Sequence, residues 1–178
     1  MQYLTHYESP IGPITLACDG TALTALWFDG QKYDRDIVED DAEWKSDIPV
    51  FEETRKWLDI YFQGKDPGFT PPLKMDGSDF YKAVGNAMLE IPFGETTTYG
   101  AIAAKVAERM GRDHMSAQAV GGAVGHNSIS VIIPCHRVVG ATGSLTGYSG
   151  GIDKKIKLLT LEGTDTSGFF VPKKSTAP

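Results

Sequence analysis

The sequence contains only two cysteines in 178 residues, Cys18 and Cys135, and they lie far apart along the chain. Two cysteines so far apart are typical of a protein with free thiols in a reducing compartment. The alternative is that they form a single disulfide. No apolar run approaches the roughly 18 residues of a membrane span, and the first residues lack the basic start and apolar stretch of a signal peptide. We therefore expect a cytoplasmic protein that does not associate with a membrane.

Basic side chains are scarce as well, since 17 Lys and Arg stand against 23 Asp and Glu and the net charge is −6. This balance argues against a nucleic-acid partner, because affinity for DNA comes largely from Lys and Arg that neutralise phosphates. The deficit is local, however: residues 1–80 hold 7 basic and 16 acidic side chains, whereas residues 81–163 hold 8 and 6. The asymmetry indicates two modules, of which only the second suits a polyanion. Acidic residues that merely solubilise the first module explain its charge equally well.

The first 72 residues have the pattern of a small domain of strands and one helix. Short apolar runs at 3–7, 14–18 and 23–28 are separated by proline and glycine turns, which predicts strands joined by hairpins. Apolar residues near helical spacing predict an amphipathic helix over 51–62. The stretch 66–72, Asp-Pro-Gly-Phe-Thr-Pro-Pro, is the best linker candidate. We therefore expect the first domain to span residues 1–72.

From residue 73 onwards the pattern changes to helices. Apolar spacing predicts helices over 79–91, 99–110, 117–125 and 152–161, with Asp79, Thr98 and Ser116 as N-caps of the first three. In the last helix we expect Ile152, Ile156 and Leu159 on the apolar face and Lys154, Lys155 and Lys157 on the polar face. The helix over 117–125 consists almost wholly of small residues, which favours a close approach to a packed helix or to a DNA groove. Two short helices joined by a turn are also the plan of a helix-turn-helix. We expect this second domain to span residues 73–163, with a flexible tail over 164–178.

One stretch of the second domain is the best candidate for chemistry. The β-branched run Val131–Ile133 predicts a buried strand that Pro134 ends, and the next two residues are Cys135 and His136. The imidazole can accept the thiol proton, directly or through water, and an acid such as Glu162 can orient the ring. A buried, inert cysteine beside a half-exposed histidine is the alternative. No metal site is expected, because no second cysteine lies nearby and the histidines lack ligand spacing.

Several motifs in this region resemble those of the O6-alkylguanine-DNA alkyltransferases, the methylated-DNA–protein-cysteine methyltransferases. The motifs are Ala119-Val120-Gly121-Gly122, Asn127, Pro134-Cys135-His136-Arg137-Val138, Gly147-Tyr148-Ser149-Gly150-Gly151 and Leu161-Glu162-Gly163. The similarity covers roughly residues 78–163, and Ser9-Pro10-Ile11-Gly12 resembles the start of the family's N-terminal domain. The resemblance implies an α+β protein, in which a ribonuclease H-like sheet-and-helix domain precedes a mostly helical domain of winged helix-turn-helix type.

The resemblance also implies a function. The family's helix-turn-helix enters the minor groove of double-stranded DNA, the alkylated guanine is flipped out, and the alkyl group moves from O6 to a cysteine, here Cys135. His136 would act as base through a bound water, and Glu162 would hold its tautomer. The thioether is stable, so each molecule reacts once, without a cofactor, on O6-alkylguanine and to a lesser degree on O4 of alkylated thymine. We expect a monomer in which Arg137 makes a structural ion pair rather than a substrate contact.

Other positions take their expected roles from the family one by one. Tyr99 matches a tyrosine that crowds the target phosphate, and Asn127 matches an asparagine that joins the recognition helix to the active-site strand. Tyr148 and Ser149 match residues that bind the flipped base, Tyr148 also as proton donor. The Val138 carbonyl would accept a hydrogen bond from the exocyclic amine of the base. The residues expected to contact DNA are Ser116, Ala117, Gln118, Ala119, Gly122 and Tyr99.

The sequence departs from the family pattern at three places. Gln118 occupies the position of an arginine that many members insert into the gap left by the flipped base, so we expect weaker DNA binding. Ser130 and Thr146 replace a proline and a glycine that shape the substrate pocket in mammalian-type members. Cys18 has no cysteine partner for the zinc site of those members, so no zinc is expected and core packing is its expected role.

Two rival functions remain open at this point. One is a non-catalytic relative that binds alkylated DNA, although such proteins replace the cysteine that is present here as Cys135. The other is a thiol hydrolase that uses Cys135 and His136, which would turn over repeatedly and need no DNA. The mass of the intact protein after exposure to alkylated DNA separates all three functions.

Overall fold

The structure, a computed structural model, describes residues 1–31 and 37–172, which form two compact units. Within these residues, the first unit comprises 1–31, 37–75 and 128–130, and the second comprises 76–127 and 131–172. The division falls just beyond the predicted linker at 66–72. Sequence patterns did not indicate that residues 128–130 belong to the first unit, because their bridge and hydrogen bonds to Thr24 and Leu26 join segments that are distant in sequence.

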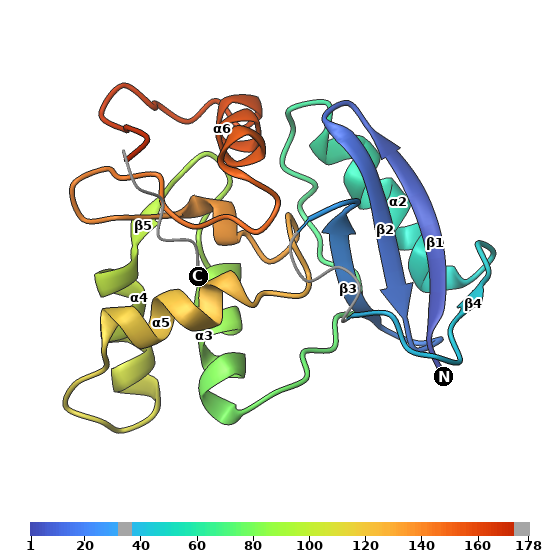
Figure 1. Ribbon diagram of the computed structural model, residues 1–178, viewed down its shortest axis with the longest axis horizontal. Coiled ribbons are helices and arrows are strands. Elements are labelled where there is room, and N and C mark those ends of the chain that lie inside the picture. Colours follow the sequence, from blue (N-terminus) through green and yellow to red (C-terminus); the bar gives the residue numbers. More distant parts are fainter. Residues whose placement is uncertain (32–36, 173–178) are drawn as a thin grey trace. The chain divides into compact units, whose positions relative to one another are not determined.

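The first unit is built on a sheet whose strands run in the order β3-β2-β1-β4. The elements are β1 (Tyr3–Ser9), β2 (Gly12–Cys18), β3 (Leu23–Phe28), β4 (Glu43–Trp44) and α2 (Pro49–Tyr61). The first three strands pair antiparallel, whereas β4 pairs parallel to β1. The β1–β2 hairpin turns at Gly12, whose φ of 134° is one that side chains rarely adopt. Figure 1 shows α2 running along the sheet, and it contacts β2 and β3.

The core of this unit explains why the strand sequences are almost continuously apolar. Both faces of β2 and β3 are buried. One apolar cluster of the sheet is covered by Ile37 and Ala42; its members are Leu4, Ala17, Ala25 and Trp27. Helix α2, which contacts β2 and β3, contributes fully buried aromatic and aliphatic side chains. Cys18 is fully buried and has a free thiol. Its expected role in core packing is therefore confirmed, as are the predicted strands and the predicted helix.

The second unit is mostly helical. Its elements are α3 (Asp79–Leu89), β5 (Thr97–Thr98), α4 (Tyr99–Arg109), α5 (Ala117–Gly125), the 3-10 helix η1 (Cys135–Arg137), β6 (Val138–Val139) and α6 (Ile152–Leu161). The helices α3, α4 and α5 pack against one another, and β5 pairs parallel to β6. Thr98 and Ser116 cap α4 and α5 through side-chain hydrogen bonds, as predicted. The cap of α3 is Ser78 rather than Asp79, which lies inside the helix.

The buried strand predicted at Val131–Ile133 is wrong. These residues are buried, with at most 5% of any side chain exposed, but they form turns rather than a strand. Val131 has a φ of 70°, which places a β-branched residue in the left-handed region and is incompatible with a continuing strand. A short apolar run predicts that its residues are buried, but it does not distinguish a strand from irregular backbone in the core.

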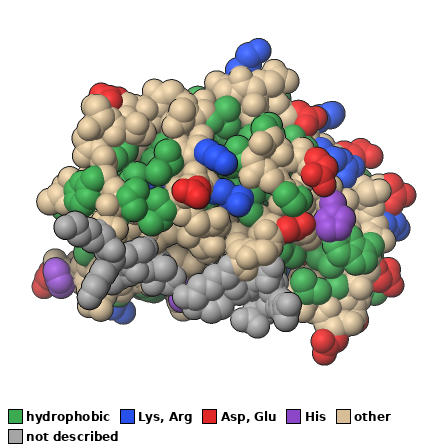
Figure 2. Space-filling view, turned by 45° about the horizontal axis from the view of Figure 1, so that its top comes forward, with side chains coloured by type: hydrophobic (Ala, Val, Ile, Leu, Met, Phe, Trp, Pro, Cys, Tyr) green, Lys and Arg blue, Asp and Glu red, His purple; other side chains and the backbone are tan. Residues whose placement is uncertain are grey.

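The chain after α6 is paired in its described part. The N–H of Leu145 donates to Phe170 O at 2.9 Å, and the N–H of Phe170 donates to Gly143 O at 3.1 Å. A flexible tail was predicted from residue 164, but the described part of this segment is hydrogen-bonded to the loop at 143–145. For residues 173–178, which lie outside the described residues, flexibility stays a prediction. Figure 2 shows acidic and basic side chains interspersed on the face that it presents. Within residues 1–31 and 37–172, no helix is long and apolar enough to cross a membrane.

Candidate active site

Cys135 lies at the first residue of η1, directly after Pro134, and only 4% of it is exposed. Asn127, which follows the C-terminal end of α5, fixes this backbone: its Nδ2 donates to Ile133 O at 2.9 Å, and its side chain also hydrogen-bonds the Cys135 thiol. Burial raises the pKa of the thiol, and the hydrogen bond from Asn127 and the charge of Lys155 offset this only in part. The resting sulfur is therefore protonated, and reaction requires a group that removes its proton.

That group is available in the next residue. His136 is fully buried, and its Nε2 lies 2.5 Å from Glu162 Oε2. Because the carboxylate accepts, Nε2 carries the hydrogen in this pair, and Nδ1 is the ring nitrogen that can take up a proton. Burial lowers the pKa of His136, with Glu162 opposing the shift, so the imidazole is neutral near pH 7 and able to act as a base.

Glu162 is held by three donors. Besides His136, it accepts from Arg137 Nε at 2.7 Å and from the N–H of Gly94 at 3.1 Å. Burial by itself would raise the pKa of Glu162, but the hydrogen bonds and charges of His136 and Arg137 outweigh it and lower the pKa to about 2. Arg137 also donates to Ile91 O at 2.7 Å. The structural ion pair expected for Arg137 is confirmed, and it keeps Glu162 ionised beside the histidine.

Lys155 is the residue of this site that the sequence analysis missed. It was expected on the polar face of α6, but none of it is exposed, and its Nζ donates to Val138 O at 2.8 Å and to Thr146 O at 2.9 Å. Burial lowers its pKa to about 8, and the nearby Cys135 opposes the shift. Its spacing offered a signal, because Ile152, Lys155 and Leu159 recur at i, i+3 and i+7, which is one face of a helix.

Aromatic residues form one side of the surroundings of the cysteine. The ring of Tyr148 meets the ring of His136 edge to face, with centroids 6.5 Å apart, and only 5% of Tyr148 is exposed. The hydroxyl of Tyr99 donates to Thr146 O at 3.3 Å, and burial, with Cys135 also contributing, raises the pKa of Tyr99. Ser149 follows Tyr148 and is half-buried. The expected pocket residues Val138, Thr146 and Tyr148 thus contact Lys155 or His136, and Tyr99, which was expected at the target phosphate, contacts Thr146.

Ser130 is placed differently from the other expected pocket residues. It belongs to the first unit, where its N–H donates to Leu26 O at 3.0 Å beside β3. Its side chain is fully buried, and its hydroxyl has no hydrogen-bond partner among the residues that the structure describes. The structure therefore gives Ser130 a packing position next to the sheet.

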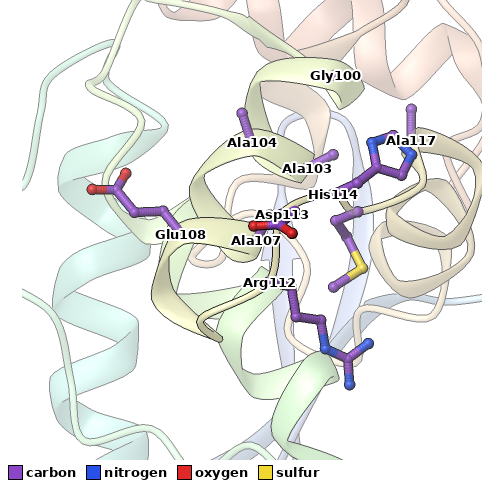
Figure 3. A pocket seen from close by; sticks show the side chains of 10 residues that line it. Gly100, Ala103, Ala104, Ala107, Glu108, Arg112, Asp113, His114 and Ala117 are labelled. Atoms are coloured by element: carbon purple, nitrogen blue, oxygen red, sulfur yellow. The ribbon is translucent and has the colours of Figure 1, made fainter.

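The expected DNA-contacting residues lie on an open helix end. Ser116, Ala117, Gln118 and Ala119 are all exposed at the start of α5, and Gly122 is half-buried. Between α4 and the turn before α5 lies a hollow of about 450 Å³, with small side chains of α4 on one side and Arg112, Asp113 and His114 on the other (Figure 3). The start of α5 therefore presents short side chains, flanked by a turn that carries a basic residue.

These features define the class of the protein: a helix-turn-helix unit that carries a buried cysteine, followed by a buried neutral histidine that is paired with an ionised glutamate. Family models agree along nearly the whole chain. Residues 79–164 match the DNA binding domain of 6-O-methylguanine DNA methyltransferase, and residues 2–75 match its ribonuclease-like domain. The chain belongs to the 6-O-methylguanine DNA methyltransferase family, and the expected α+β fold is confirmed.

Individual relatives support the same conclusion. The chain is 43% identical over 162 residues to the methylated-DNA–protein-cysteine methyltransferase of Mycobacterium tuberculosis, covering 89% of this chain and 93% of the relative. It is 43% identical over 163 residues to that of Methanosarcina acetivorans, covering 91% and 99%. Among solved structures, Mycobacterium tuberculosis OGT in complex with DNA has a TM-score of 0.77 at 41% identity, covering 90% of this chain and 92% of that one.

Proposed function

We propose that the protein repairs DNA by moving a methyl or other alkyl group from O6 of guanine, and to a lesser degree from O4 of thymine, to the sulfur of Cys135. The observation that carries the proposal is the buried series Cys135, His136, Glu162 and Arg137, held in a helix-turn-helix unit. A solvent-exposed thiol would react with many electrophiles. A buried thiol reacts only with a group that is delivered to it.

The bonds and protons balance without a cofactor. His136 takes the proton of the Cys135 thiol, directly or through a water molecule, and Glu162 stabilises the resulting imidazolium. The thiolate attacks the alkyl carbon, a carbon–sulfur bond forms, and the bond between that carbon and O6 breaks. The electron pair stays on the guanine, which is protonated in turn, with the Tyr148 hydroxyl as donor. No step regenerates the thiol, so each molecule reacts once.

Delivery of the base requires DNA distortion. A thiol buried inside a protein cannot reach O6 of a guanine stacked in a duplex, so the nucleotide must rotate out of the helix. The exposed start of α5 can approach the minor groove closely because its side chains, apart from Gln118, are short. Tyr99 at the start of α4 would crowd the phosphate of the target nucleotide, and Gln118 would fill the space that the base leaves. Asn127 links the end of α5 to the cysteine, so one segment connects groove and sulfur.

Single-turnover mass spectrometry tests this function. The protein is incubated with a duplex that contains O6-methylguanine, and the intact protein is weighed. The expected result is the gain of one methylene mass, which Cys135→Ala abolishes and Cys18→Ala, the matched control at the other cysteine, retains. An unchanged mass with retained DNA binding would identify a non-catalytic binder, and continuing turnover of a thioester without DNA would identify a hydrolase.

The proposal also includes the place and form of action, a monomer in the cytoplasm. The two free cysteines support this compartment, because its reducing conditions keep thiols free.

A further inference from the structure

The segment after α6 is tied to the loop that precedes Tyr148 and Ser149. We call residues 164–170 the C-terminal strap and residues 140–149 the pocket loop. Gly143 and Leu145 of the loop each share a backbone hydrogen bond with Phe170, which makes a parallel bridge between Ser144 and Phe170. Within the strap, the N–H of Ser167 donates to Asp165 Oδ1 and the N–H of Phe169 donates to Thr166 O, so the strap has turns of its own.

Side-chain packing adds to the backbone pairing. Phe169 is half-buried and packs against the apolar cluster of Val139, Leu145 and Leu159. This cluster joins β6, the pocket loop and α6, so the strap rests on the elements that surround the cysteine. Phe170, by contrast, is 48% exposed and contributes mainly through its backbone.

Gly143 is the point of closest approach between strap and loop. A Cβ atom at Gly143 would overlap the carbonyl oxygen of Gly168, and the φ of 91° at Gly143 is one that side chains rarely adopt. The overlapped atom belongs to the backbone, which cannot rotate away as a side chain can. Even a single methyl group at position 143 must therefore displace the strap from the loop.

The pocket loop connects Gly143 to residues that surround Cys135. One residue beyond Leu145, the carbonyl oxygen of Thr146 accepts from both Lys155 Nζ and the Tyr99 hydroxyl. Tyr148 follows two residues later and meets the His136 ring. A shift of the loop at Gly143 to Leu145 therefore changes the position of groups that face the sulfur.

We propose that the C-terminal strap positions the pocket loop for alkyl transfer, with Gly143 and Phe169 as positioning residues for the reaction at Cys135; this rests on the function proposed above. Among the described residues, no hydrogen bond joins residues 164–170 to Cys135 or to the start of α5. Loosening the strap therefore slows the transfer step in bound DNA far more than it weakens DNA binding. A strap that only stabilised the fold would change neither quantity in molecules that remain folded.

Rapid-quench single-turnover kinetics separates the two quantities. Protein in excess reacts with an O6-methylguanine duplex, and the transfer rate at saturation and the half-saturating protein concentration are measured for wild type, Gly143→Ala, Phe169→Ala and Phe169→Leu. Displacement of positioned groups by about 1 Å can cost up to a hundredfold in rate. We expect Gly143→Ala and Phe169→Ala to lower the saturating rate by about tenfold or more with at most a twofold change in the half-saturating concentration, and Phe169→Leu to recover most of the rate.

Gly68→Ala is the matched control, since Gly68 also has a positive φ, 77°, but a Cβ there meets nothing within 4 Å. It is expected to keep the wild-type rate. If circular dichroism shows that Gly143→Ala does not fold, the rates of Phe169→Ala and Phe169→Leu test the strap proposal. Saturating rates within twofold of wild type in the folded variants overturn the strap proposal alone. A wild-type protein that gains no methyl group overturns the proposed function, and the strap proposal with it.

Discussion

The side-chain nitrogen of Lys155 lies 2.8 Å from the carbonyl oxygen of Val138, and both residues are completely buried. A lysine in this position is costly to bury. Its two hydrogen bonds, to Val138 O and Thr146 O, offset part of this desolvation cost. Because Val138 O has two lone pairs, it can accept from Lys155 and still accept from a bound base.

Lys155→Met is expected to lower both stability and thiol reactivity. The buried carbonyl of Val138 loses its side-chain donor, and Thr146 O keeps only the Tyr99 hydroxyl, which together costs about 1–3 kcal/mol of the free energy of unfolding. The charge that favours the thiolate is lost as well, so the pKa of Cys135 rises further. Urea unfolding and the pH dependence of alkylation by iodoacetamide measure the two effects. Lys157→Met, at an exposed position of the same helix, is the control, and an equally small effect in both variants would contradict the prediction.

Glu162 is expected to make stability depend on pH in the acid range. Its pKa of about 2 in the folded protein lies below the value of about 4.3 in an unfolded chain. Such a carboxyl contributes stability that is fully present above the unfolded pKa and is lost as the pH falls through the folded pKa. About 3 kcal/mol should therefore disappear between roughly pH 4.5 and pH 2.

Denaturant unfolding at several pH values measures this contribution. The difference in free energy of unfolding between wild type and Glu162→Gln should be large at pH 6 and should shrink towards pH 2. Glu108→Gln, an exposed position on α4, serves as control. A difference for Glu162→Gln that stays constant across this range would show that its carboxylate is not held in the ionised form by His136 and Arg137.

Tyr148→Phe is expected to slow alkyl transfer without altering the site's packing. The ring keeps its edge-to-face contact with His136, while the hydroxyl that would protonate the departing guanine is lost. Loss of a positioned general acid typically costs about 10²–10⁴-fold in rate. Single-turnover transfer from O6-methylguanine measures the loss, and a Phe variant with the wild-type rate would assign the proton to another donor.

Local patterns predicted the helices well and the buried irregular backbone poorly. The helix over 117–125 was predicted with its observed bounds because Ser116 caps it and the spacing of small residues is local. Lys155 was placed on the wrong face because charge was given more weight than its spacing from Ile152 and Leu159. The turn at Val131 could not be predicted, since a left-handed valine is imposed by tertiary packing and opposed by its own side chain.

The site was predictable to a similar extent. Cys135, His136 and Glu162 were predicted from the sequence, with His136 as proton acceptor and Glu162 as orienting acid from their chemistry alone, and the structure brings them together. The family resemblance supplied the alkyl-acceptor role of Cys135 and the roles of the residues that bind the flipped base. The strap was not predicted, because residues 164–168 are small and polar and the two phenylalanines that follow them form no periodic pattern. Their pairing with Gly143 and Leu145 depends on contacts between segments that are distant in sequence, which local propensity does not encode.

Gln118→Arg is expected to strengthen binding to duplex DNA. Gln118 is exposed near the start of α5, and it has no charge to offer a phosphate or a disrupted base pair. An arginine there adds one cation at the groove, so the slope of log affinity against log salt should steepen by about 0.9 for one additional phosphate contact. Fluorescence anisotropy with an unmodified duplex at several salt concentrations measures the slope.

Gln63→Arg, which adds the same charge at an exposed position of the first unit, separates a local contact from a change in net charge. Equal slopes for the two variants would show that position 118 makes no contact with DNA, and an unchanged affinity at fixed salt would mean that glutamine does not weaken binding.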